Sequence, residues 1–404
     1  MANILGIVTG KINKVQALKA IDVFYNEPKF HQIVTPNPEI ILSAQNDEEL
    51  FYILNHTDLS LADGFGLKIA AFLSRQKIHR FTGADLLPYL LEEANKNQRR
   101  ILIINRVDGL SSNDDIKNYL SKNYPKINTL LISSPIRNSA SPDESAKIRD
   151  FAPNLAINLF GSPAQEKYIH NLKNISTHIN IGVGLGGAFD FLTNKIKRAP
   201  VFLRYLGLEW FWRLLMQPTQ RRKRARRIWR AIAVFMYEFI RWQYILPHRY
   251  RANVAILMFK ENNQGREIFI LKRQDEKNHW QLPQGGLDGE NIIKGGSREL
   301  EEESGSHSFT IRAVYKNLYK YKFQNEAGTY NKLDTQRHAG YKGQKQSLLI
   351  VQFQGSDDEF HLNYWDHQAW RWVKEESFID TLHPIRQKAG KIYLKKLRNL
   401  KIPA

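Results

Sequence analysis

Short apolar runs alternate with helical patterns through the first half of the chain. Four runs bounded by turn-forming residues predict buried strands of a parallel sheet, at 101–105, 129–133, 155–161 and 179–187. The stretch 111–123 between the first two runs has the pattern of a helix. The alternation predicts an α/β domain over residues 1–200.

A second pattern begins after Pro247. Apolar runs there predict strands at 254–259, 267–272, 347–353 and 370–373, and helical spacing predicts helices at 291–304 and 384–399. This pattern predicts a smaller α+β domain over residues 250–404.

Residues 201–249 between these domains are aromatic and strongly basic. Positions 201–250 carry 11 Lys and Arg against 2 Asp and Glu, and RRKRARRIWR (221–230) holds most of them. No uncharged apolar run reaches the length of about 18 residues that a membrane span needs. Three interpretations remain: helices on an anionic membrane surface, a hairpin packed on its own domain, or a nucleic-acid contact. We favour the membrane surface, with aromatic rings at headgroup depth: Trp210, Trp212, Trp229 and Trp242.

Composition narrows the class of protein. The 404 residues are 42% hydrophobic and 25% charged, which excludes a mainly disordered, fibrous or multi-spanning membrane protein. The chain has no Cys, so disulfides, Cys-ligated zinc and thiol catalysis are excluded. The start MANILGIVTG lacks a basic region followed by a long apolar region, so we expect no signal peptide and a cytoplasmic location.

The sharpest motif is QLPQGGLDGENIIKGGSRELEEESGS, residues 281–306. On a helix, Glu299, Glu302 and Glu303 share one face because they are spaced i, i+3 and i+4. Clustered carboxylates repel one another unless a cation lies among them, and Mg²⁺ or Mn²⁺ prefers such oxygen ligands. A solvated acidic face is the alternative, but this spacing after a Gly-Gly turn favours a metal that activates water and neutralises a pyrophosphate.

This segment resembles the Nudix box, G-x5-E-x7-R-E-U-x-E-E-x-G-U, where U is aliphatic. The resemblance implies an α/β/α sandwich in which Glu299, Glu302 and Glu303 bind metal, with Glu302 and Glu303 catalytic. It also implies that Arg298 orients the helix through an ion pair. The remaining structural positions of the box are Gly285, Gly286, Glu290 and Gly305.

Three departures from the box concern rate and loop geometry rather than the carboxylates. The loop from Gly285 to Glu290 is one residue short, and Ser306 replaces an aliphatic residue. Gly295 and Gly296 lie inside the helix, where each costs about 1 kcal/mol relative to Ala.

The flanks HWQLPQGG (279–286), GQKQ (343–346), WRWV (370–373) and PIRQ (384–387) resemble one branch of the family. That branch holds RNA pyrophosphohydrolases and dinucleoside tetraphosphate hydrolases. The resemblance implies that Lys345 contacts phosphate and that the substrate is a nucleoside polyphosphate or an RNA 5′ end.

Polar clusters follow the apolar runs of the first domain, where an open α/β sheet binds its ligands. They are TPNPE (35–39), ADGFG (62–66), RFTGADL (80–86), FGSPAQEKYI (160–169) and GVGLGGAFDF (182–191). Gly182, Gly184 and Gly187 also satisfy G-x-G-x-x-G, but no βαβ unit with an acidic residue about 20 positions on follows. Any single cluster can also be an ordinary loop, with Asn and Pro as turn formers. For the clusters together, we favour a sugar-nucleotide site over a dinucleotide cofactor.

In this order, and with RAPVFLRYLGLEWFWRLLMQP (198–218), the clusters resemble the WecG/TagA/CpsF glycosyltransferases over residues 1–245. The resemblance implies a Rossmann-like fold and inverting transfer of an N-acetylmannosamine-type sugar from a UDP donor. The acceptor would be linked to undecaprenyl diphosphate, at the inner face of the cell membrane. A homo-oligomer is also implied.

The resemblance assigns Asp63 as the base that takes the acceptor's hydroxyl proton. It places Thr35 and Asn37 in the sugar pocket and Arg80 at the departing diphosphate. The positions assigned to the donor or to lipid phosphates are Gln165, Glu166, Arg221, Arg222 and Arg224. Residues 1–250 contain no Asp-x-Asp, so we expect no metal in this domain. Asp85 and Asp190 are expected to cap or pair locally.

The sequence therefore predicts a bifunctional enzyme. An alternative is that the Nudix domain is a catalytically weak module that senses a nucleotide or binds an RNA end and regulates the transferase. A third hypothesis uses residues 221–230 for RNA binding, which would depend steeply on salt. A further hypothesis couples the two activities, with the hydrolase acting on a nucleotide product or competing sugar nucleotide.

Overall fold

The structure is a computed structural model that describes residues 2–200, 203, 212, 232–263, 265–274, 276–323, 338 and 340–400. It divides into two compact units, Met1–Gln243 with Lys332–Gly340 and Tyr244–Asn331 with Tyr341–Ala404. We refer to them as the first and second units. The division falls between residues 243 and 244, six residues before the boundary predicted from the sequence.

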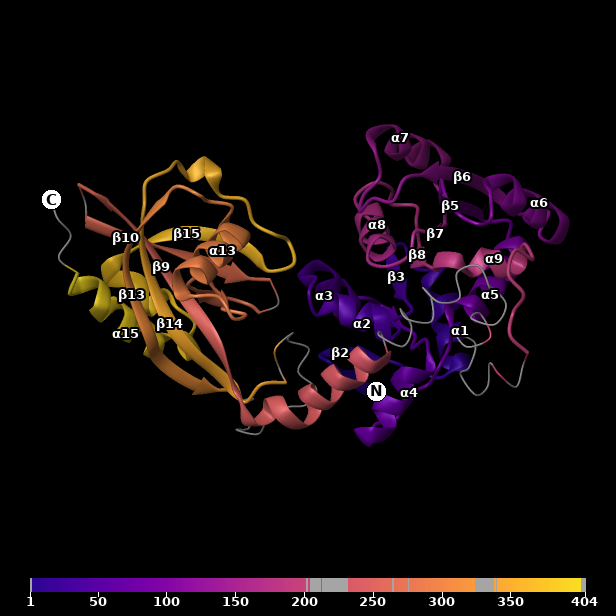
Figure 1. Ribbon diagram of the computed structural model, residues 1–404. Helices are drawn as coiled ribbons and strands as arrows, with labels where there is room; N and C mark the ends of the chain where they lie inside the picture. Colours follow the sequence, from indigo (N-terminus) through magenta and orange to yellow (C-terminus); the bar gives the residue numbers. More distant parts are fainter. Residues whose placement is uncertain are drawn as a thin grey trace. The chain divides into compact units, whose positions relative to one another are not determined.

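The first unit is built on a six-stranded parallel sheet in the order β4-β3-β8-β7-β5-β6 (Figure 1). Its strands are β3 (His31–Val34), β4 (Leu59–Ser60), β5 (Arg100–Arg106), β6 (Asn128–Ser134), β7 (Leu155–Asn158) and β8 (Ile181–Gly184). A separate hairpin pairs β1 (Ala2–Ile4) with β2 (Ile7–Thr9). The four predicted apolar runs form β5 to β8, so the predicted α/β class is confirmed, whereas the short β3 and β4 were not predicted.

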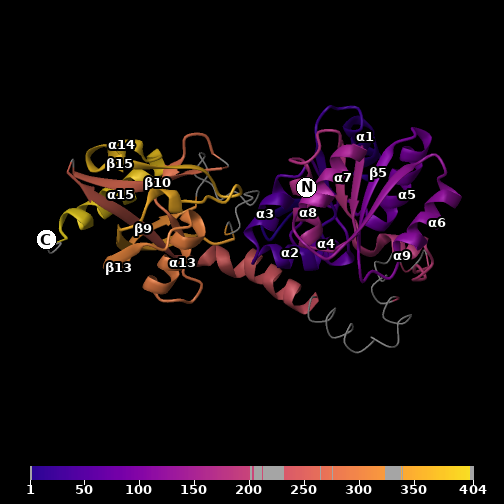
Figure 2. The ribbon, with the colours of Figure 1, turned by 90° about the horizontal axis from the view of Figure 1, so that it is seen from above.

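Helices cover both faces of this sheet because consecutive residues of its strands are apolar and point to opposite faces. On β5, Ile101 and Ile103 pack with the helices of one face, and Leu102 and Ile104 pack with those of the other. The first face carries α1 (Lys14–Phe24), α5 (Gly83–Lys96) and α6 (Asn113–Asn123), and the second carries α7 (Pro142–Phe151) and α8 (Ala164–Leu172). Figure 2 shows these helices around the sheet from a second direction.

Local signals begin several of these helices. Asn13, Ser112 and Ser141 each form a capping box with the third residue of the following helix. Among the described residues, this part of the chain also forms α2 (Pro38–Ala44), α3 (Glu48–Asn55), α4 (Phe65–Leu73), α9 (Phe189–Leu192) and a helix over 232–240. That helix continues as a π-helical turn, Arg241–Ile245, which includes the boundary between the units. Within the described residues, no helix combines the length and apolar character needed to cross a bilayer.

The second unit is a mixed sheet between two helices. Its order is β11-β10-β9-β14-β13, with β12 paired to β9 and β15 paired to β10. The strands are β9 (Tyr250–Asn262), β10 (Gly265–Arg273), β11 (Trp280–Gln281), β12 (Gln284–Gly286), β13 (Phe309–Lys322), β14 (Gly343–Phe353) and β15 (His367–Lys374). The predicted strands form β9, β10, β14 and β15, and β13 was not predicted.

The two principal helices of this unit lie on opposite faces of the sheet. Val254 and Ile256 pack in the core beneath α13 (Ile292–Ser304), and Ala255 and Leu257 pack in the core beneath α15 (Pro384–Arg398). A shorter helix, α14 (Phe378–Thr381), precedes α15. The predicted helices over 291–304 and 384–399 are therefore confirmed, as is the α/β/α sandwich.

Candidate active sites

A cavity of about 480 Å³ opens at the carboxyl ends of the strands of the first unit. Thr35, Asn37, Asp63 and Gln165 line it together, although 130 positions separate the first from the last. The first three come from the loops after β3 and β4, and Gln165 lies in the first turn of α8, which follows β7. The parallel topology brings these segments to one edge of the sheet. Four of the residues predicted from sequence thus share one site.

Asp63 lies where the loops after β3 and β4 are joined. Its backbone N–H donates to the carbonyl oxygen of Pro36 at 2.9 Å. Gly64 follows with φ of 89°, a conformation that favours glycine, and begins α4. A Cβ on Gly66 would lie 2.7 Å from Pro38, so this glycine permits the close approach of the two loops. The ADGFG cluster therefore presents a half-buried carboxylate at the cavity.

Asn37 and Thr35 occupy the end of β3. The Asn37 side-chain oxygen accepts from the backbone N–H of Ile40 at 2.9 Å and caps α2. The amide N–H groups of Asn37 are therefore the donors that it can offer to a ligand. Thr35 is buried, and a Cβ on Gly83 would lie 3.5 Å from its hydroxyl oxygen.

Gln165 holds two loops of the cavity in place. Its Oε1 accepts from the backbone N–H groups of Gly161, at 3.1 Å, and Gly186, at 2.9 Å. Its Nε2 donates to Oε1 of Glu166 at 2.7 Å. A Cβ on Gly184 would lie 2.6 Å from the Gln165 side chain, so this glycine makes room for it. Gln165 is thus a positioning residue for the loops after β7 and β8.

Glu166 does not line the cavity among the described residues, contrary to the sequence expectation. It is 2% exposed and lies behind Gln165, and burial raises the pKa of its carboxyl. In the segment PAQE (163–166), Gln165 therefore faces the cavity, whereas Glu166 lies inside the protein.

Arg80 pairs through its backbone with Ala62, beside β4, and lies outside the described lining of the cavity. The positive charge of Arg80 favours the ionised form of the Asp85 carboxyl. Burial opposes ionisation of that carboxyl, but a hydrogen bond from Thr82 and the charges of Arg198 and Arg80 hold the pKa of Asp85 below its usual value. Arg198 contacts Asp85 at 2.5 Å. Asp85 thus pairs locally.

Asp190 also makes a local contact, because it accepts a hydrogen bond from the Ser111 hydroxyl at 2.7 Å. The glycines of the G-x-G-x-x-G pattern are explained by packing. A Cβ on Gly182 would meet Ile169 at 2.7 Å and Phe30 at 2.9 Å.

Arg106 lines the cavity and was missed in the sequence analysis. It is the last residue of β5 and is held by Asp108, which accepts from its Nε at 2.9 Å and from its Nη2 at 2.6 Å. A basic residue directly after the buried run 101–105 was the available signal. Arg106 adds a cation to a cavity in which the residues predicted from the sequence are polar or acidic.

Most of the aromatic and basic segment 201–249, between residues 201 and 231, lies outside the described residues. The predicted residues that fall there are Arg221, Arg222, Arg224, Trp210 and Trp229. Trp212 donates its indole N–H to the carbonyl oxygen of Lys197 at 3.2 Å. The expectation that Trp242 lies at headgroup depth is wrong for this structure, because Trp242 is 7% exposed and packs closely against Gly340.

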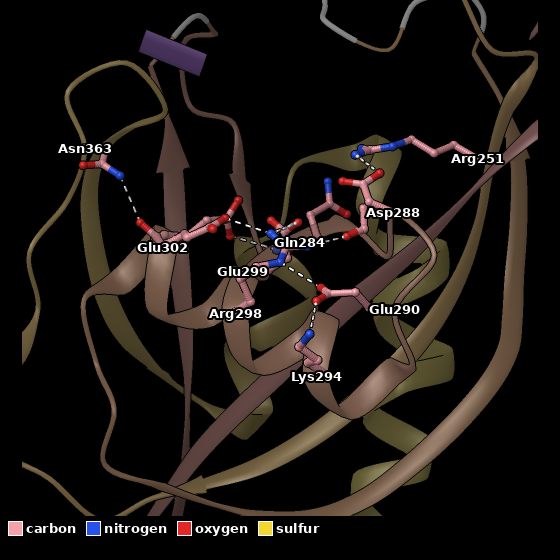
Figure 3. Close-up of polar contacts among 11 residues, drawn as sticks. Arg251, Gln284, Asp288, Glu290, Lys294, Arg298, Glu299, Glu302 and Asn363 are labelled. Atoms are coloured by element: carbon pink, nitrogen blue, oxygen red, sulfur yellow. Dashed lines mark hydrogen bonds and ion pairs between the residues drawn. The ribbon is translucent and has the colours of Figure 1, made fainter. Parts of the chain in front are cut away.

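In the second unit, Arg298 is the centre of a charged network (Figure 3). It donates to Glu290 and Glu302, both at 2.9 Å, contacts Glu299 at 3.0 Å, and donates to the carbonyl oxygen of Gly286 at 2.9 Å. Burial opposes its charge, but these carboxylates raise the pKa of Arg298. Hydrogen bonds from Arg298 and Lys294 lower the pKa of Glu290. One guanidinium thus joins the glycine loop to α13.

The oxygen donors of α13 fit a hard divalent cation. Glu299 and Glu302 flank the same nitrogen of Arg298, and Glu303 accepts from the backbone N–H of Gln284 at 2.9 Å. A Cβ on Gly285 would lie 1.7 Å from an oxygen of Glu299, so this glycine leaves the space that the carboxylate fills. The donor set is all oxygen, as Mg²⁺ or Mn²⁺ prefers.

The two helix glycines have a packing role that the sequence did not reveal. A Cβ on Gly295 would lie 2.8 Å from Leu287, and one on Gly296 would lie 2.6 Å from Leu349. Both glycines are buried. Gly295 lets α13 approach the loop after β12, and Gly296 lets it approach β14. Gly305 ends the helix with φ of 78°, and its N–H donates to the carbonyl oxygen of Glu301 at 2.8 Å.

Arg251 is a second cation that the sequence analysis missed. It is 9% exposed, contacts Asp288 at 3.3 Å, and would clash with a Cβ on Gly286. Lys345 is exposed on β14 and shares a face of that strand with Leu349, against which α13 packs. The neighbouring Gln346 donates to Gln284 at 2.7 Å.

Glu276, His279 and His383 form another cluster, with ligand atoms within 4.8 Å of one another. Nδ1 of His279 contacts Glu276, and Arg386 donates to its Nε2 at 3.5 Å. Arg386 also donates to the Tyr321 hydroxyl at 2.9 Å. The Arg386 guanidinium thus already occupies the Nε2 side of His279. We therefore interpret this cluster as a group that positions Arg386 and not as a site for a metal ion.

The first unit is similar in sequence to known glycosyltransferases. The family model "Glycosyl transferase WecG/TagA/CpsF family" matches residues 2–249. An N-acetylglucosaminyldiphosphoundecaprenol N-acetyl-beta-D-mannosaminyltransferase of Bacillus subtilis is 30% identical over 214 residues. That alignment covers 51% of this chain and 80% of the relative.

The second unit has its own relatives. The NUDIX domain model matches residues 249–395. An RNA pyrophosphohydrolase of the Brugia malayi Wolbachia is 34% identical over 147 residues, which cover 35% of this chain and 86% of the relative. A C. elegans Ap4A hydrolase structure is 16% identical, with 37% of this chain and 99% of that chain covered at a TM-score of 0.29. The chain therefore belongs to the WecG/TagA/CpsF glycosyltransferase family through residues 2–249, and this region is fused to a Nudix hydrolase domain over residues 249–395.

Proposed function

We propose that the first unit transfers N-acetylmannosamine, or a related hexosamine, from a UDP-sugar to an acceptor linked to undecaprenyl diphosphate. The observation that carries this proposal is the cavity that gathers Thr35, Asn37, Asp63 and Gln165. The name of the Bacillus subtilis relative supports the sugar and the acceptor.

In this mechanism, the Asp63 carboxylate accepts the proton of the acceptor hydroxyl. The hydroxyl oxygen bonds to the anomeric carbon as the bond from that carbon to the UDP oxygen breaks, so UDP leaves with the electron pair. Arg106, which lines the cavity, would meet the developing diphosphate charge. Arg80 lies beside β4 and outside the described lining, so it would act on that charge from a greater distance. Asn37 would orient the sugar through its amide.

Transfer assays test this role directly. Asp63→Asn is expected to lower turnover by about 10²–10⁴-fold because a general base is lost. Asp143→Asn is the matched control, since Asp143 is an exposed helical carboxylate with 75% of its side chain accessible. Equal turnover in the two variants would remove Asp63 from the mechanism.

We further propose that the second unit hydrolyses a phosphoanhydride of a nucleoside polyphosphate or an RNA 5′ end. Glu299, Glu302 and Glu303 would hold Mg²⁺ or Mn²⁺, which supplies charge neutralisation and a more acidic water. Arg298 keeps the carboxylates and the glycine loop together. Lys345 and Arg251 are the cations offered to substrate phosphates.

A substrate panel decides between hydrolysis and nucleotide sensing. The panel holds UDP-sugars, dinucleoside polyphosphates and 5′-triphosphate RNA. Glu302→Gln is expected to abolish metal-dependent turnover, whereas Glu301→Gln on the same helix is expected to retain it. Nucleotide binding without turnover in the wild type would favour the sensor. Hydrolysis of RNA ends or dinucleotides, with no cleavage of sugar nucleotides, would end the proposed coupling of the two units.

We also propose peripheral attachment at the inner face of the membrane, because residues 201–250 carry 11 basic and 2 acidic residues. Anionic lipid attracts such a block at about 1 kcal/mol per nearby basic residue. Steep, salt-dependent RNA binding without vesicle binding would instead support the nucleic-acid interpretation.

A further inference from the structure

Helix α4 carries an apolar stripe that is exposed in the part of the first unit that the structure describes. Phe65, Ile69, Phe72 and Leu73 are spaced i, i+4, i+7 and i+8, so they lie along one side of the helix. Phe72 is 80% exposed, and the other three are between 38% and 42% exposed. The opposite side, with Leu67, Ala70 and Ala71, is buried in the unit. We call the four exposed residues the α4 stripe.

The charged residues within α4 and directly after it in the sequence are all basic. Lys68, Arg75 and Lys77 are exposed on α4 or directly after it, and no Asp or Glu occurs between Asp63 and Asp85. An apolar stripe beside basic residues has the composition of helices that lie in a bilayer interface. Long basic side chains can place their charge at lipid phosphates while rings enter the apolar layer.

The stripe also begins close in sequence to the cavity, which is proposed to receive a lipid-linked acceptor. Phe65 is two residues after Asp63, whose carboxylate lines the cavity. A surface that met the bilayer here would hold the proposed base near the membrane plane, where a polyprenyl-linked acceptor lies. A second copy of the chain is a poorer occupant, since a two-fold contact through this surface would bring basic residues together.

We propose that the α4 stripe docks on an anionic lipid bilayer and presents the cavity to membrane-bound acceptor. The inference rests on the proposed lipid-linked acceptor and is separate from the basic block at 221–230. It assigns membrane contact to an element of the α/β core.

Vesicle partitioning of the full chain tests this docking. The probes are vesicles of phosphatidylcholine with phosphatidylglycerol and vesicles of phosphatidylcholine alone. Phe72→Asp is expected to weaken partitioning to the anionic vesicles about tenfold. The control is Val23→Asp, on α1, where Val23 is 52% exposed. Unchanged partitioning of Phe72→Asp would overturn the proposal.

A charge-reversal pair tests the basic flank. The double variant Lys68→Glu with Arg75→Glu is expected to lose about tenfold or more on anionic vesicles and little on neutral ones. Lys117→Glu with Lys122→Glu, both exposed on α6, is the matched control. Equal losses in the two double variants would overturn the role of the flank.

Transfer assays separate this inference from the proposed function. With a water-soluble acceptor, Phe72→Asp is expected to retain turnover within about twofold, and with acceptor in vesicles it is expected to lose about tenfold. If the wild type transfers to neither acceptor, the proposed function fails, while vesicle partitioning still decides the docking. A lower molar mass of Phe72→Asp with unchanged partitioning would assign the stripe to a second copy of the chain.

Discussion

The two candidate sites are assembled in opposite ways. In the second unit, the glycine loop and the carboxylates proposed to bind metal lie within 22 consecutive residues, Gln284 to Gly305, on one loop and one helix. In the first unit, Thr35 and Gln165 meet only because parallel strands end at a common edge. A contiguous site follows from helical periodicity, whereas a dispersed site requires the whole topology.

This difference also shows in the supporting residues. Arg298 reaches three carboxylates and a loop carbonyl, all within 12 positions of it in the chain. Gln165 joins loops after two different strands and is itself backed by a buried carboxylate. The contiguous site therefore depends on one guanidinium close in sequence to its partners, whereas the dispersed site depends on one amide that joins distant loops.

The largest expected effect comes from breaking the contiguous site at its centre. Arg298→Lys keeps the charge but cannot reproduce the forked contacts to Glu290, Glu302 and Gly286. We expect metal-dependent hydrolysis to fall about 10–100-fold, as for other residues that orient metal ligands. Lys294→Ala is the control, because the exposed Lys294 pairs with Oε1 of Glu290, whereas Arg298 pairs with Oε2. Similar rates in both variants would show that the network is dispensable.

A matching change tests the dispersed site. Gln165→Leu leaves the N–H groups of Gly161 and Gly186 without their acceptor, at a cost of about 1–3 kcal/mol in unfolding free energy. We expect transferase turnover to fall about tenfold, by displacement of both loops. Gln45→Leu, which removes a side chain that bonds to Leu5 and Ile41, should leave turnover unchanged. Retained turnover in Gln165→Leu would exclude the positioning role.

A smaller effect separates propensity from packing. Helix propensity alone predicts that Gly296→Ala stabilises α13 by about 1 kcal/mol. Because the new Cβ would lie 2.6 Å from Leu349, we expect a loss of about 1–2 kcal/mol in chemical denaturation instead. Ser297→Ala, one position along, should be neutral or slightly stabilising. A more stable Gly296→Ala variant would contradict the packing explanation.

The smallest effect is a change in the shape of a pH profile. The hydrogen bond from His279 is the main cause that lowers the pKa of Glu276 to about 2. A lowered carboxyl pKa contributes stability above the usual pKa near 4.5, and that stability is lost as pH falls towards 2. Glu276→Gln should therefore flatten the decline of unfolding free energy across this range. Parallel profiles in wild type and variant would contradict the shift.

Much of the architecture follows from local pattern. Buried runs at 101–105 and 254–259 predicted strands because both faces of each sheet are covered and nearly every residue is apolar. β13 lies at the sheet edge and has no continuous apolar run of the kind that predicted the other strands. The alternation of apolar and charged residues, as in Tyr319, Lys320 and Tyr321, was the available signal, because it is the pattern of a half-buried strand. Short β3 and β4 offered too few residues to show a period.

The sequence by itself determined the two fold classes, the two families and the carboxylate face of α13. Each depends on residue order or on periodicity within one element. Only the tertiary structure decided that Glu166 lies behind Gln165, that Gly295 and Gly296 serve packing, and that Arg106 lines the cavity. These outcomes depend on which distant side chains approach one another, and close packing sets such approaches over the whole domain.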